Sequence, residues 1–254
     1  MIALRLAGRE LRTLFAAPLP WLLLALGQVV GAWWFLTLVE RFRGQYQAVL
    51  QQTNSPLGVT DLVVAPFFGS YVLLGVLLLA AALLAMRLLA EERRSGSLRL
   101  LFAAPLAVTE IVLGKYLAAL AYLLVFLAGW LFMPLGLLAG TELDLGRLAA
   151  AALALGLVAA AMASVALFAS SLVAQPAVAV VLTAGVLLAL LGLDTALGSG
   201  DPVIAYLAVL PHYEGLVQGR VVSTDALYFL LLTAGFLGFT IRRLDGLRWH
   251  GTGV

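Results

Sequence analysis

Long apolar runs dominate this sequence, and their length limits the possible folds more than any other feature. One run extends from Leu62 to Met86, and another extends from Ile111 to Ala139 with a break only at Gly114 and Lys115. A helix needs roughly 20 apolar residues to cross a bilayer. Each run is therefore long enough to span a membrane.

The composition agrees with a membrane protein that crosses the bilayer several times. Hydrophobic residues make up 63% of the chain and charged residues only 11%, whereas soluble domains carry about 25% charged residues. Apolar run length and the bounding charged, proline or glycine residues predict an all-α fold with six transmembrane helices. We place them at residues 18–39, 62–87, 112–138, 148–173, 176–194 and 224–242.

Two segments outside these spans have helical patterns of their own. Residues 1–17 are expected to form an interfacial helix, with Arg5, Arg9 and Arg12 on one face and apolar residues on the other. The apolar face is predicted to consist of Leu4, Ala7, Leu11, Leu14 and Phe15. Pro18 and Pro20 then turn the chain into the first span. Residues 195–223 are expected to form an outer segment whose apolar stretch, ended by Pro211, is too short to cross and is predicted to be a re-entrant or surface helix.

The distribution of basic residues predicts the orientation. Eleven Lys and Arg residues lie on the side of the N-terminus and four on the other, which together make the fifteen of the chain. The eleven are Arg5, Arg9, Arg12, Arg87, Arg93, Arg94, Arg99, Lys115, Arg242, Arg243 and Arg248; the four are Arg41, Arg43, Arg147 and Arg220. Since basic residues favour the cytoplasmic side, we expect both termini and the loop at residues 88–110 to be cytoplasmic. A prokaryotic inner membrane is the simplest location.

Several function classes are disfavoured by what the sequence lacks. The basic residues flank spans and form no continuous patch with interleaved aromatics, which argues against nucleic-acid binding. Absence of cysteine excludes thiolate metal sites, and we expect neither a metal site nor catalytic residues. No Asp, Glu or His lies near the middle of a span, so an ion-coupled carrier is disfavoured. Gly114-Lys115 is followed by Tyr116 and is not a phosphate-binding loop. Any energy source therefore belongs to a partner.

The loop after the second span resembles a family signature. Glu91-Glu92-Arg93-Arg94-Ser95-Gly96-Ser97, then Pro105 and Gly114-Lys115, are similar to the pattern of permease subunits of ABC-2-type transporters. The closing stretch LPHYEGLVQGRVVSTDALYFLLLTAGFLGFT resembles the gliding-motility (GldF-like) branch of that family. One departure is Arg99, where the family often has an acidic residue.

The resemblance implies a single ABC-2-type transmembrane domain over residues 1–254, paired with a second copy or a paralogous permease. It also implies two cytoplasmic ATPase subunits, which bind the ATP and Mg while this chain binds no cofactor. The implied function is export of an amphipathic or polymeric substrate. The alternative is an ATP-driven mechanical relay to periplasmic or other membrane partners, without substrate passage.

The charged loop is the candidate site for coupling to the ATPase. Ser95 or Ser97 is expected to cap a short helix at residues 98–103, after a tight turn at Gly96. The coupling residues are predicted to be Glu91, Glu92, Arg93, Arg94, Ser95, Gly96, Ser97, Leu98, Arg99, Leu101 and Phe102. Of these, Leu98, Leu101 and Phe102 form an apolar face for a groove on the partner. The arginines alternatively only anchor the loop at anionic lipid headgroups. Glu91 and Glu92 either pair with the arginines of residues 1–17 or are solvated.

Two further sets of residues are candidates for packing and transport. Gly27 and Gly31 share one face of the first span, and with Gln28 they are the candidate dimer interface, although most motifs of this kind pack helices within one chain. Trp33, Trp34 and Phe68 are candidates for an apolar substrate path, although most aromatic residues near span ends belong to interfacial belts. Lys115 is expected to be an interface anchor, and His212 a helix cap or interface residue.

Overall fold

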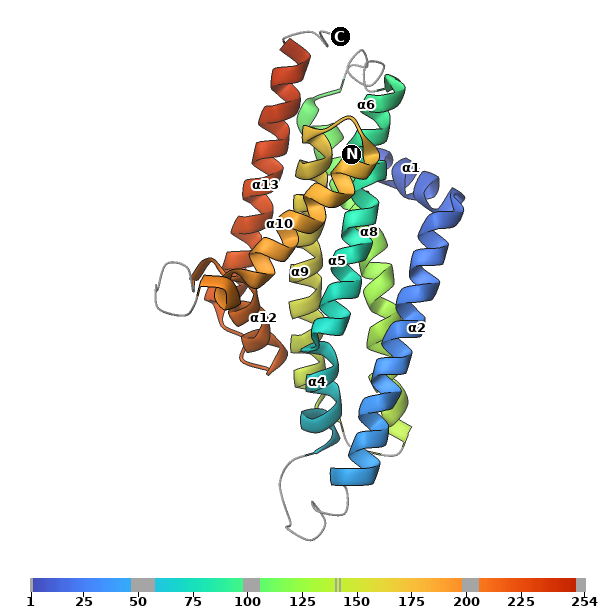
Figure 1. Cartoon of the computed structure of the whole chain (residues 1–254), viewed down its shortest axis with the longest axis vertical. Helices are drawn as coiled ribbons and strands as arrows, with labels where there is room; N and C mark the ends of the chain where they lie inside the picture. Colours follow the sequence, from blue (N-terminus) through green and yellow to red (C-terminus); the bar gives the residue numbers. More distant parts are fainter. Residues whose placement is uncertain are drawn as a thin grey trace.

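The fold is a bundle of long helices, seen here in a computed structural model (Figure 1). The structure describes residues 2–46, 58–97, 106–139, 141, 143–197 and 206–249. The helices of the first half are α1 (Ile2–Ala16), α2 (Pro18–Arg41), α4 (Ala65–Phe68), α5 (Tyr71–Ala85), α6 (Glu91–Ser95) and α8 (Val108–Leu135). The second half contains α9 (Leu145–Leu172), α10 (Pro176–Leu197), α12 (Val209–Val217) and α13 (Ser223–Trp249). Short π-helical turns are η1 (Phe42–Tyr46), η2 (Thr60–Val64) and η3 (Met86–Ala90), and η4 (Gly136–Ala139) is a 3-10 turn.

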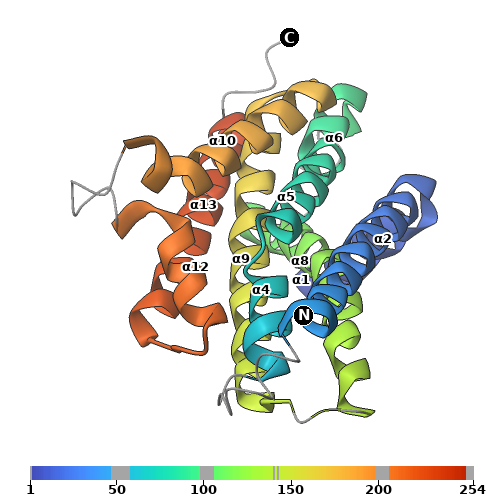
Figure 2. The same ribbon diagram turned by 60° about the horizontal axis from the view of Figure 1, so that its bottom comes forward.

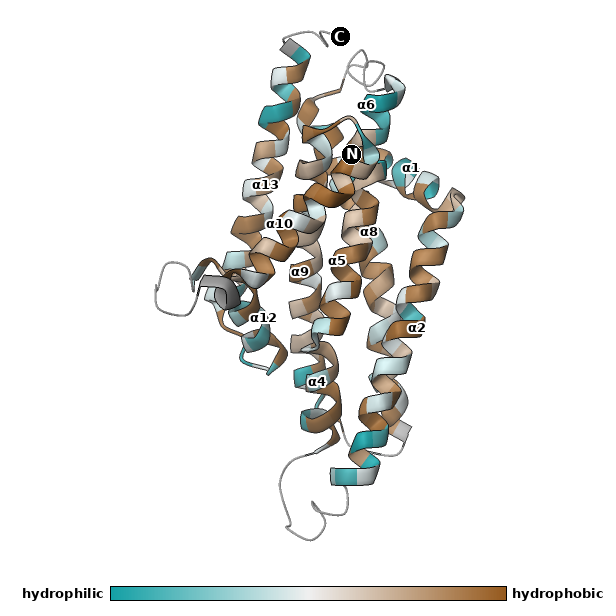
Figure 3. Cartoon of the chain, in the orientation of Figure 1, coloured by the Kyte–Doolittle hydropathy of each residue, from teal (hydrophilic) through white to brown (hydrophobic). Residues whose placement is uncertain are grey.

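Within the described residues, six continuous helical stretches are long and apolar enough to cross a membrane. They are Pro18–Tyr46, Thr60–Ser95, Val108–Leu138, Leu145–Leu172, Pro176–Leu193 and Ser223–Arg248. Hydrophobic residues fill the middle of the bundle, and hydrophilic residues gather at its two ends (Figure 3). The all-α fold with six spans is therefore confirmed, and the chain is a multi-pass membrane protein.

The two ends of the bundle differ in charge. At one end, α6 lies near the C-terminal end of α13, at the top of Figure 1. Arg248 from that part of α13 donates to the carbonyl oxygen of Leu106 just before α8, at 3.3 Å. We call this the basic end, because Arg87, Arg93, Arg94 and Arg243 lie there. The start of α9, the end of α2 and α4 lie at the opposite end.

Helix α9 is the centre of the bundle. It contacts α5, α8, α10, α12 and α13, and Figure 2 shows it between α10, α12 and α13 on one side and α5, α8 and α2 on the other. Small side chains allow this close approach. The small residues Ala159, Ala163, Ala166 and Ser170 along α9 are all buried.

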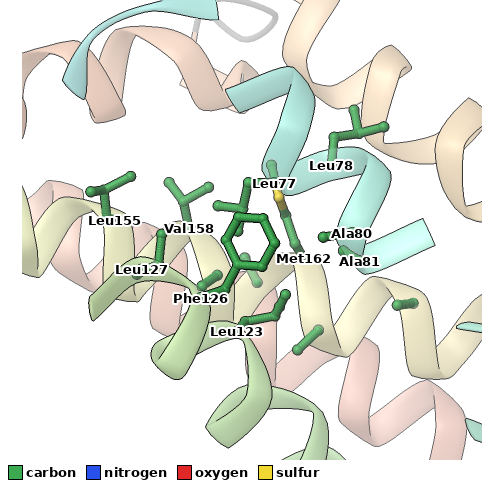
Figure 4. Packing of buried hydrophobic residues seen from close by; sticks show 14 of the residues in the cluster. Leu77, Leu78, Ala80, Ala81, Leu123, Phe126, Leu127, Leu155, Val158 and Met162 are labelled. Atoms are coloured by element: carbon green, nitrogen blue, oxygen red, sulfur yellow. The ribbon is translucent and has the colours of Figure 1, made fainter. Parts of the chain in front are cut away.

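Large apolar side chains fill the space between α5, α8 and α9. In Figure 4, Phe126 of α8 lies among Leu77 of α5 and Val158 and Met162 of α9. Phe126 and Trp130 are both buried, and their rings meet edge to face at 5.0 Å between centroids. This packing fixes α8 and α9 relative to each other.

The turn between α1 and α2 follows the prediction. Pro18 and Pro20 lie in the first turn of α2, where their missing N–H groups have no helical partner to lose. Ala17 before them has an extended backbone, with φ −93° and ψ 149°, as expected for a residue that precedes proline. Helix α1 therefore ends at Ala16 and lies across the bundle axis (Figure 1).

The outer helix differs from the prediction for residues 195–223. Pro211 was expected to end a short helix, but α12 begins at Val209 and continues through Pro211 to Val217. Proline is tolerated there because it occupies the first turn. Helix α12 is held inside the fold, since the Tyr213 hydroxyl donates to the carbonyl oxygen of Phe68 at 2.6 Å. Residues 198–205 lie outside the described part of the chain.

Candidate functional site

The helix of the second span extends beyond its apolar run, and this extension carries five of the eleven candidate coupling residues. The apolar span was predicted to end at residue 87, and the helix itself continues beyond it through η3 and α6 to Ser95. Gly96 ends it with a left-handed backbone at φ 75°, a conformation that favours glycine. The predicted turn at Gly96 is therefore confirmed. We call Met86–Ser95 the coupling segment.

The predicted coupling residues are only partly within the described chain. The Ser95 and Ser97 hydroxyl oxygens lie 2.9 Å apart. Glu91, Arg94, Ser95 and Ser97 are exposed, whereas Glu92 and Arg93 are half-buried. Leu98, Arg99, Leu101 and Phe102 lie outside the described residues, and so does the helix predicted at 98–103.

Ser170 of α9 fastens the start of the coupling segment. Its hydroxyl oxygen accepts from the backbone N–H groups of Leu89 and Ala90, both at 2.9 Å, and its proton goes to the carbonyl oxygen of Ala85 at 2.6 Å. A π-helical turn displaces backbone groups from the regular α-helical ladder. The Ser170 hydroxyl pairs with the displaced backbone groups, using its one proton and both of its lone pairs. Hydrogen bonds from this side chain to the backbone therefore join α9 to the coupling segment.

Arg93 makes a second contact between the coupling segment and α9. One guanidinium nitrogen of Arg93 donates to the carbonyl oxygen of Ser171 at 2.6 Å. This carbonyl belongs to the last turn of α9, where helix carbonyls lack intrahelical partners and favour a cation. The coupling segment therefore contacts the end of α9 at two consecutive residues, Ser170 and Ser171.

A buried charge cluster fastens the coupling segment to α8 and α1. The Lys115 ammonium of α8 lies 2.6 Å from Glu92 Oε1 and 3.3 Å from Glu10 Oε2. Lys115 is fully buried, which makes its two carboxylate partners necessary. We refer to Glu10, Glu92 and Lys115 as the charge cluster.

The charge cluster corrects two predictions. Lys115 is not an interface anchor, because its side chain is enclosed by protein. Glu92 pairs with Lys115 rather than with Arg5, Arg9 or Arg12, all three of which are exposed on α1. The expected link between residues 1–17 and the loop nevertheless exists, since Glu10 shares Lys115 with Glu92.

Helix α1 packs along α8 rather than lying free of the bundle. Leu6, Ala7 and Leu14 are buried, and Leu6 lies where a Cβ on Gly114 would stand, with Cδ2 at 2.7 Å. Leu4 was predicted on the same apolar face, but it is 69% exposed. The face that packs against α8 is therefore rotated from the predicted one toward Leu6.

The candidate dimer face of α2 is occupied within the chain. Phe126 lies against Gly27, and Trp130 lies against Gly31. Trp130 Nε1 donates to the carbonyl oxygen of Gly27 at 3.1 Å, and Gln28 Nε2 donates to that of Phe126 at 2.8 Å. The prediction that Gly27, Gln28 and Gly31 contact a second permease is thus wrong for this face, because α8 already fills it.

The candidate substrate-path residues differ in burial, although the rings of Trp33 and Trp34 lie 6.3 Å apart between centroids. Phe68 is fully buried and packs edge to face on Phe67 at 4.9 Å between centroids. It belongs to the core, which corrects its assignment to a path. Trp33 is 63% exposed, while the neighbouring Trp34 is half-buried, with Arg41 5.9 Å from its ring centroid.

The opposite end of the bundle has its own polar contacts. Arg147 of α9 pairs with Asp61 of η2, and Asp144 caps α9 by accepting from the N–H groups of Gly146 and Arg147 at 2.9 and 3.1 Å. The backbone N–H of Asp144 donates to Thr60 Oγ1 at 3.1 Å. These contacts join the starts of the second and fourth spans.

His212 is part of the contact between α12 and α13. Its Nδ1 lies 2.7 Å from Asp225 Oδ1, and its Nε2 lies 3.0 Å from the carbonyl oxygen of Tyr206. The imidazole stacks on Tyr228 at 4.3 Å between ring centroids. His212 thus joins α12 to α13 within the chain, and its expected role as a helix cap or membrane-interface residue stays a prediction.

Sequence reasoning missed Ser170 and Glu10 as contacts of the coupling segment. A signal was present for the charge cluster, because Lys115 interrupts an otherwise apolar run and a charge at that position needs a partner. Ser170 offered no such signal, since a serine in an alanine-rich helix is ordinarily read as a small packing residue.

Comparison with known families agrees with this architecture. A family model described as "ABC-2 family transporter protein" matches residues 43–203, which is more than half of the chain. A comparison with curated proteins finds no match. The matched region begins at the end of the first span and includes the coupling segment, α8, α9 and α10. The chain therefore belongs to the ABC-2 transporter family and is a membrane-spanning permease subunit of an ABC transporter.

Proposed function

We propose that this permease couples ATP hydrolysis by separate cytoplasmic ATPase subunits to export of an amphipathic or polymeric substrate. The ATPase subunits bind the ATP and Mg. The basic end faces the cytoplasm of a prokaryotic cell, so that both termini lie inside. The excess of basic residues at this end supports that orientation.

The coupling segment carries the proposal. It extends the second span as continuous helix and is joined to α9 through Ser170 and to α8 through Lys115. A force applied beyond Gly96 would displace the coupling segment, and these contacts would pass the displacement to α9. Because α9 contacts α5, α10 and α13, the motion reaches spans throughout the bundle.

The docking surface for the ATPase is the sequence that follows the coupling segment. Leu98, Leu101 and Phe102 supply an apolar face, and Arg93, Arg94 and Arg99 supply charge. Arg5, Arg9 and Arg12, exposed on α1, face the interface between membrane and cytoplasm. Glu10 links α1 to the coupling segment, because it shares Lys115 with Glu92.

The functional assembly contains a second copy of this permease or a paralogue. Since α8 covers the Gly27 face of α2, the contact between permeases uses another surface. The closing stretch from Leu210 supports a place in the gliding-motility (GldF-like) branch. In that branch, an auxiliary membrane or periplasmic protein is a further expected partner.

Co-purification with the ATPase tests the proposal. The full-length chain, isolated from its native membrane, is expected to retain an ATP-binding subunit at equal stoichiometry. Leu101→Asp should lose that subunit, because a charge enters the apolar docking face. Leu145→Asp is the matched control, since Leu145 is 60% exposed at the opposite end, and it should retain the ATPase. An equal amount of ATPase with both variants would contradict the proposed docking surface.

A further inference from the structure

A pocket opens beside the coupling segment at the basic end of the bundle. It has a volume of about 410 Å³ and is lined by Met86, Arg87, Glu91, Arg94, Ser95 and Pro176. The first five belong to the coupling segment, and Pro176 is the first residue of α10. The pocket therefore lies where the second span leaves its apolar stretch and where the fifth span begins.

The arginines of the pocket lack carboxylate partners in the described part of the chain. Arg87 is half-buried, and its Nε is buried without a hydrogen-bond partner. Glu91 follows Arg87 by one helical turn and precedes Arg94 by three residues, yet among the described residues no ion pair within 4.0 Å forms between them. A buried guanidinium donor that is left unpaired is costly. The Arg87 Nε–H in this pocket therefore lacks a hydrogen-bond acceptor.

The charge of the pocket calls for an anion. Arg87 and Arg94 outnumber Glu91, and Arg93 on the same segment lies close enough to Arg243 of α13 for the two charges to repel. A guanidinium binds phosphate through parallel hydrogen bonds, which satisfy the Nε–H together with a terminal N–H. An anionic oxygen group at Arg87 would supply the missing acceptor.

The position of the pocket distinguishes a lipid from a soluble anion. Arg87 directly follows the apolar residues of α5, so it lies at the depth of lipid headgroups at the basic end. Met86 and Pro176 add an apolar wall below the two arginines. We propose that this pocket binds the phosphate headgroup of an anionic phospholipid, which then contacts the coupling segment and α10 together.

Native mass spectrometry of the full-length chain tests the lipid site. Purified protein receives phosphatidylglycerol or phosphatidylcholine at equal concentration, and the first bound lipid is counted. We expect the wild-type chain to prefer phosphatidylglycerol by roughly tenfold, which corresponds to ~1.4 kcal/mol. Arg87→Gln with Arg94→Gln should abolish most of this preference. Arg43→Gln with Arg220→Gln is the matched control, because it removes the same charge from exposed residues at the opposite end, and it should keep the preference.

A second variant separates charge loss from misfolding. Arg87→Lys with Arg94→Lys keeps the positive charge but loses the fork geometry, so it should fold and retain part of the preference. A phosphatidylglycerol preference that survives in the glutamine variant would overturn the proposal, as would an equal loss in the control. Displacement of the lipid by millimolar inorganic phosphate would indicate a soluble anion instead. Loss of the ATPase from the glutamine variant with lipid preference unchanged would assign the arginines to the protein partner.

Discussion

At the scale of single residues, the buried polar groups near the basic end decide how the coupling segment is held. Lys115 is enclosed between two carboxylates, and Ser170 uses its whole hydroxyl on the backbone of another helix. Removing one partner of such a buried pair lowers the stability of the fold by more than the intact pair adds to it. Both sites are therefore open to direct tests by substitution.

The charge cluster predicts a non-additive double mutant. Lys115→Met leaves Glu10 and Glu92 without their shared cation and should lower the free energy of unfolding by about 3 kcal/mol. Glu92→Gln should cost less, because Lys115 keeps Glu10 at 3.3 Å. Combining the two changes should restore part of the loss, measured by unfolding in detergent micelles. Strictly additive effects would mean that the residues do not interact.

Ser170 and Ser164 form a matched pair of buried serines on α9. The Ser164 hydroxyl donates to Ala161 of its own helix at 2.7 Å, whereas Ser170 binds three backbone groups of the second span. Ser170→Ala should destabilise the chain by about 1 to 3 kcal/mol, because buried N–H groups lose their acceptor. Ser164→Ala should cost less than Ser170→Ala, because the Ser164 hydroxyl bonds only within its own helix and leaves no N–H group of another span without an acceptor. If the two substitutions lower the unfolding midpoint equally, the bonds of Ser170 to the coupling segment do not stabilise the fold.

At the scale of elements, the seam between α2 and α8 replaces the predicted dimer contact. The glycines of α2 are needed because aromatic side chains of α8 occupy the space that a Cβ would take. The indole nitrogen of Trp130 would lie 2.4 Å from a Cβ on Gly31, which is closer than van der Waals contact allows. The two helices therefore pack against each other within one chain.

Substitution of Gly31 tests the seam. Gly31→Ala should destabilise the fold by about 1 to 3 kcal/mol, because Trp130 must move in a packed interior. Gly8→Ala is the control, since a Cβ at Gly8 of α1 meets nothing within 4 Å. Alanine there should be neutral or stabilising by up to about 1 kcal/mol, owing to its higher helix propensity. A neutral Gly31→Ala with loss of a permease dimer would restore the original dimer prediction.

The elements also show which parts of the fold were predictable from sequence. Run length predicts the spans because the thickness of a bilayer sets helix length, and proline and glycine placed the turns at Pro18 and Gly96. Apolar patterns cannot tell which helix a small residue faces, so the sequence alone could not decide whether Gly27 contacts a second permease or a helix of the same chain. The continuation of the helix to Ser95 could not be predicted, because charged residues end the apolar run at Arg87. In the structure, Ser170 accepts hydrogen bonds from the backbone of Leu89 and Ala90 and so stabilises the helix beyond that point.

At the scale of the whole molecule, charge asymmetry and the coupling segment act together. The basic end carries the coupling segment, the end of α13 and the charge cluster. The permease can receive force only if this end faces the ATPase. Orientation in the membrane and contact with the partner are therefore two separate tests of one account.

Single cysteines test the orientation, because the natural chain contains none. Ser95→Cys at the basic end should be protected from a membrane-impermeant thiol reagent in intact cells. Thr141→Cys at the opposite end should react, since both positions are exposed on the folded chain. Permeabilised cells provide the control, in which both should be labelled. Reaction of Ser95→Cys in intact cells would reverse the orientation and exclude a cytoplasmic ATPase at this end.

Photo-crosslinking from position 97 tests the central claim most directly. Ser97 is exposed just beyond Gly96, so a photoreactive amino acid placed there should lie against the partner that moves the coupling segment. Irradiation of the native membrane should join the permease to an ATP-binding subunit, while the same probe at Thr141 should not. Capture of the ATP-binding subunit from Thr141, with none from Ser97, would contradict coupling through Met86–Ser95.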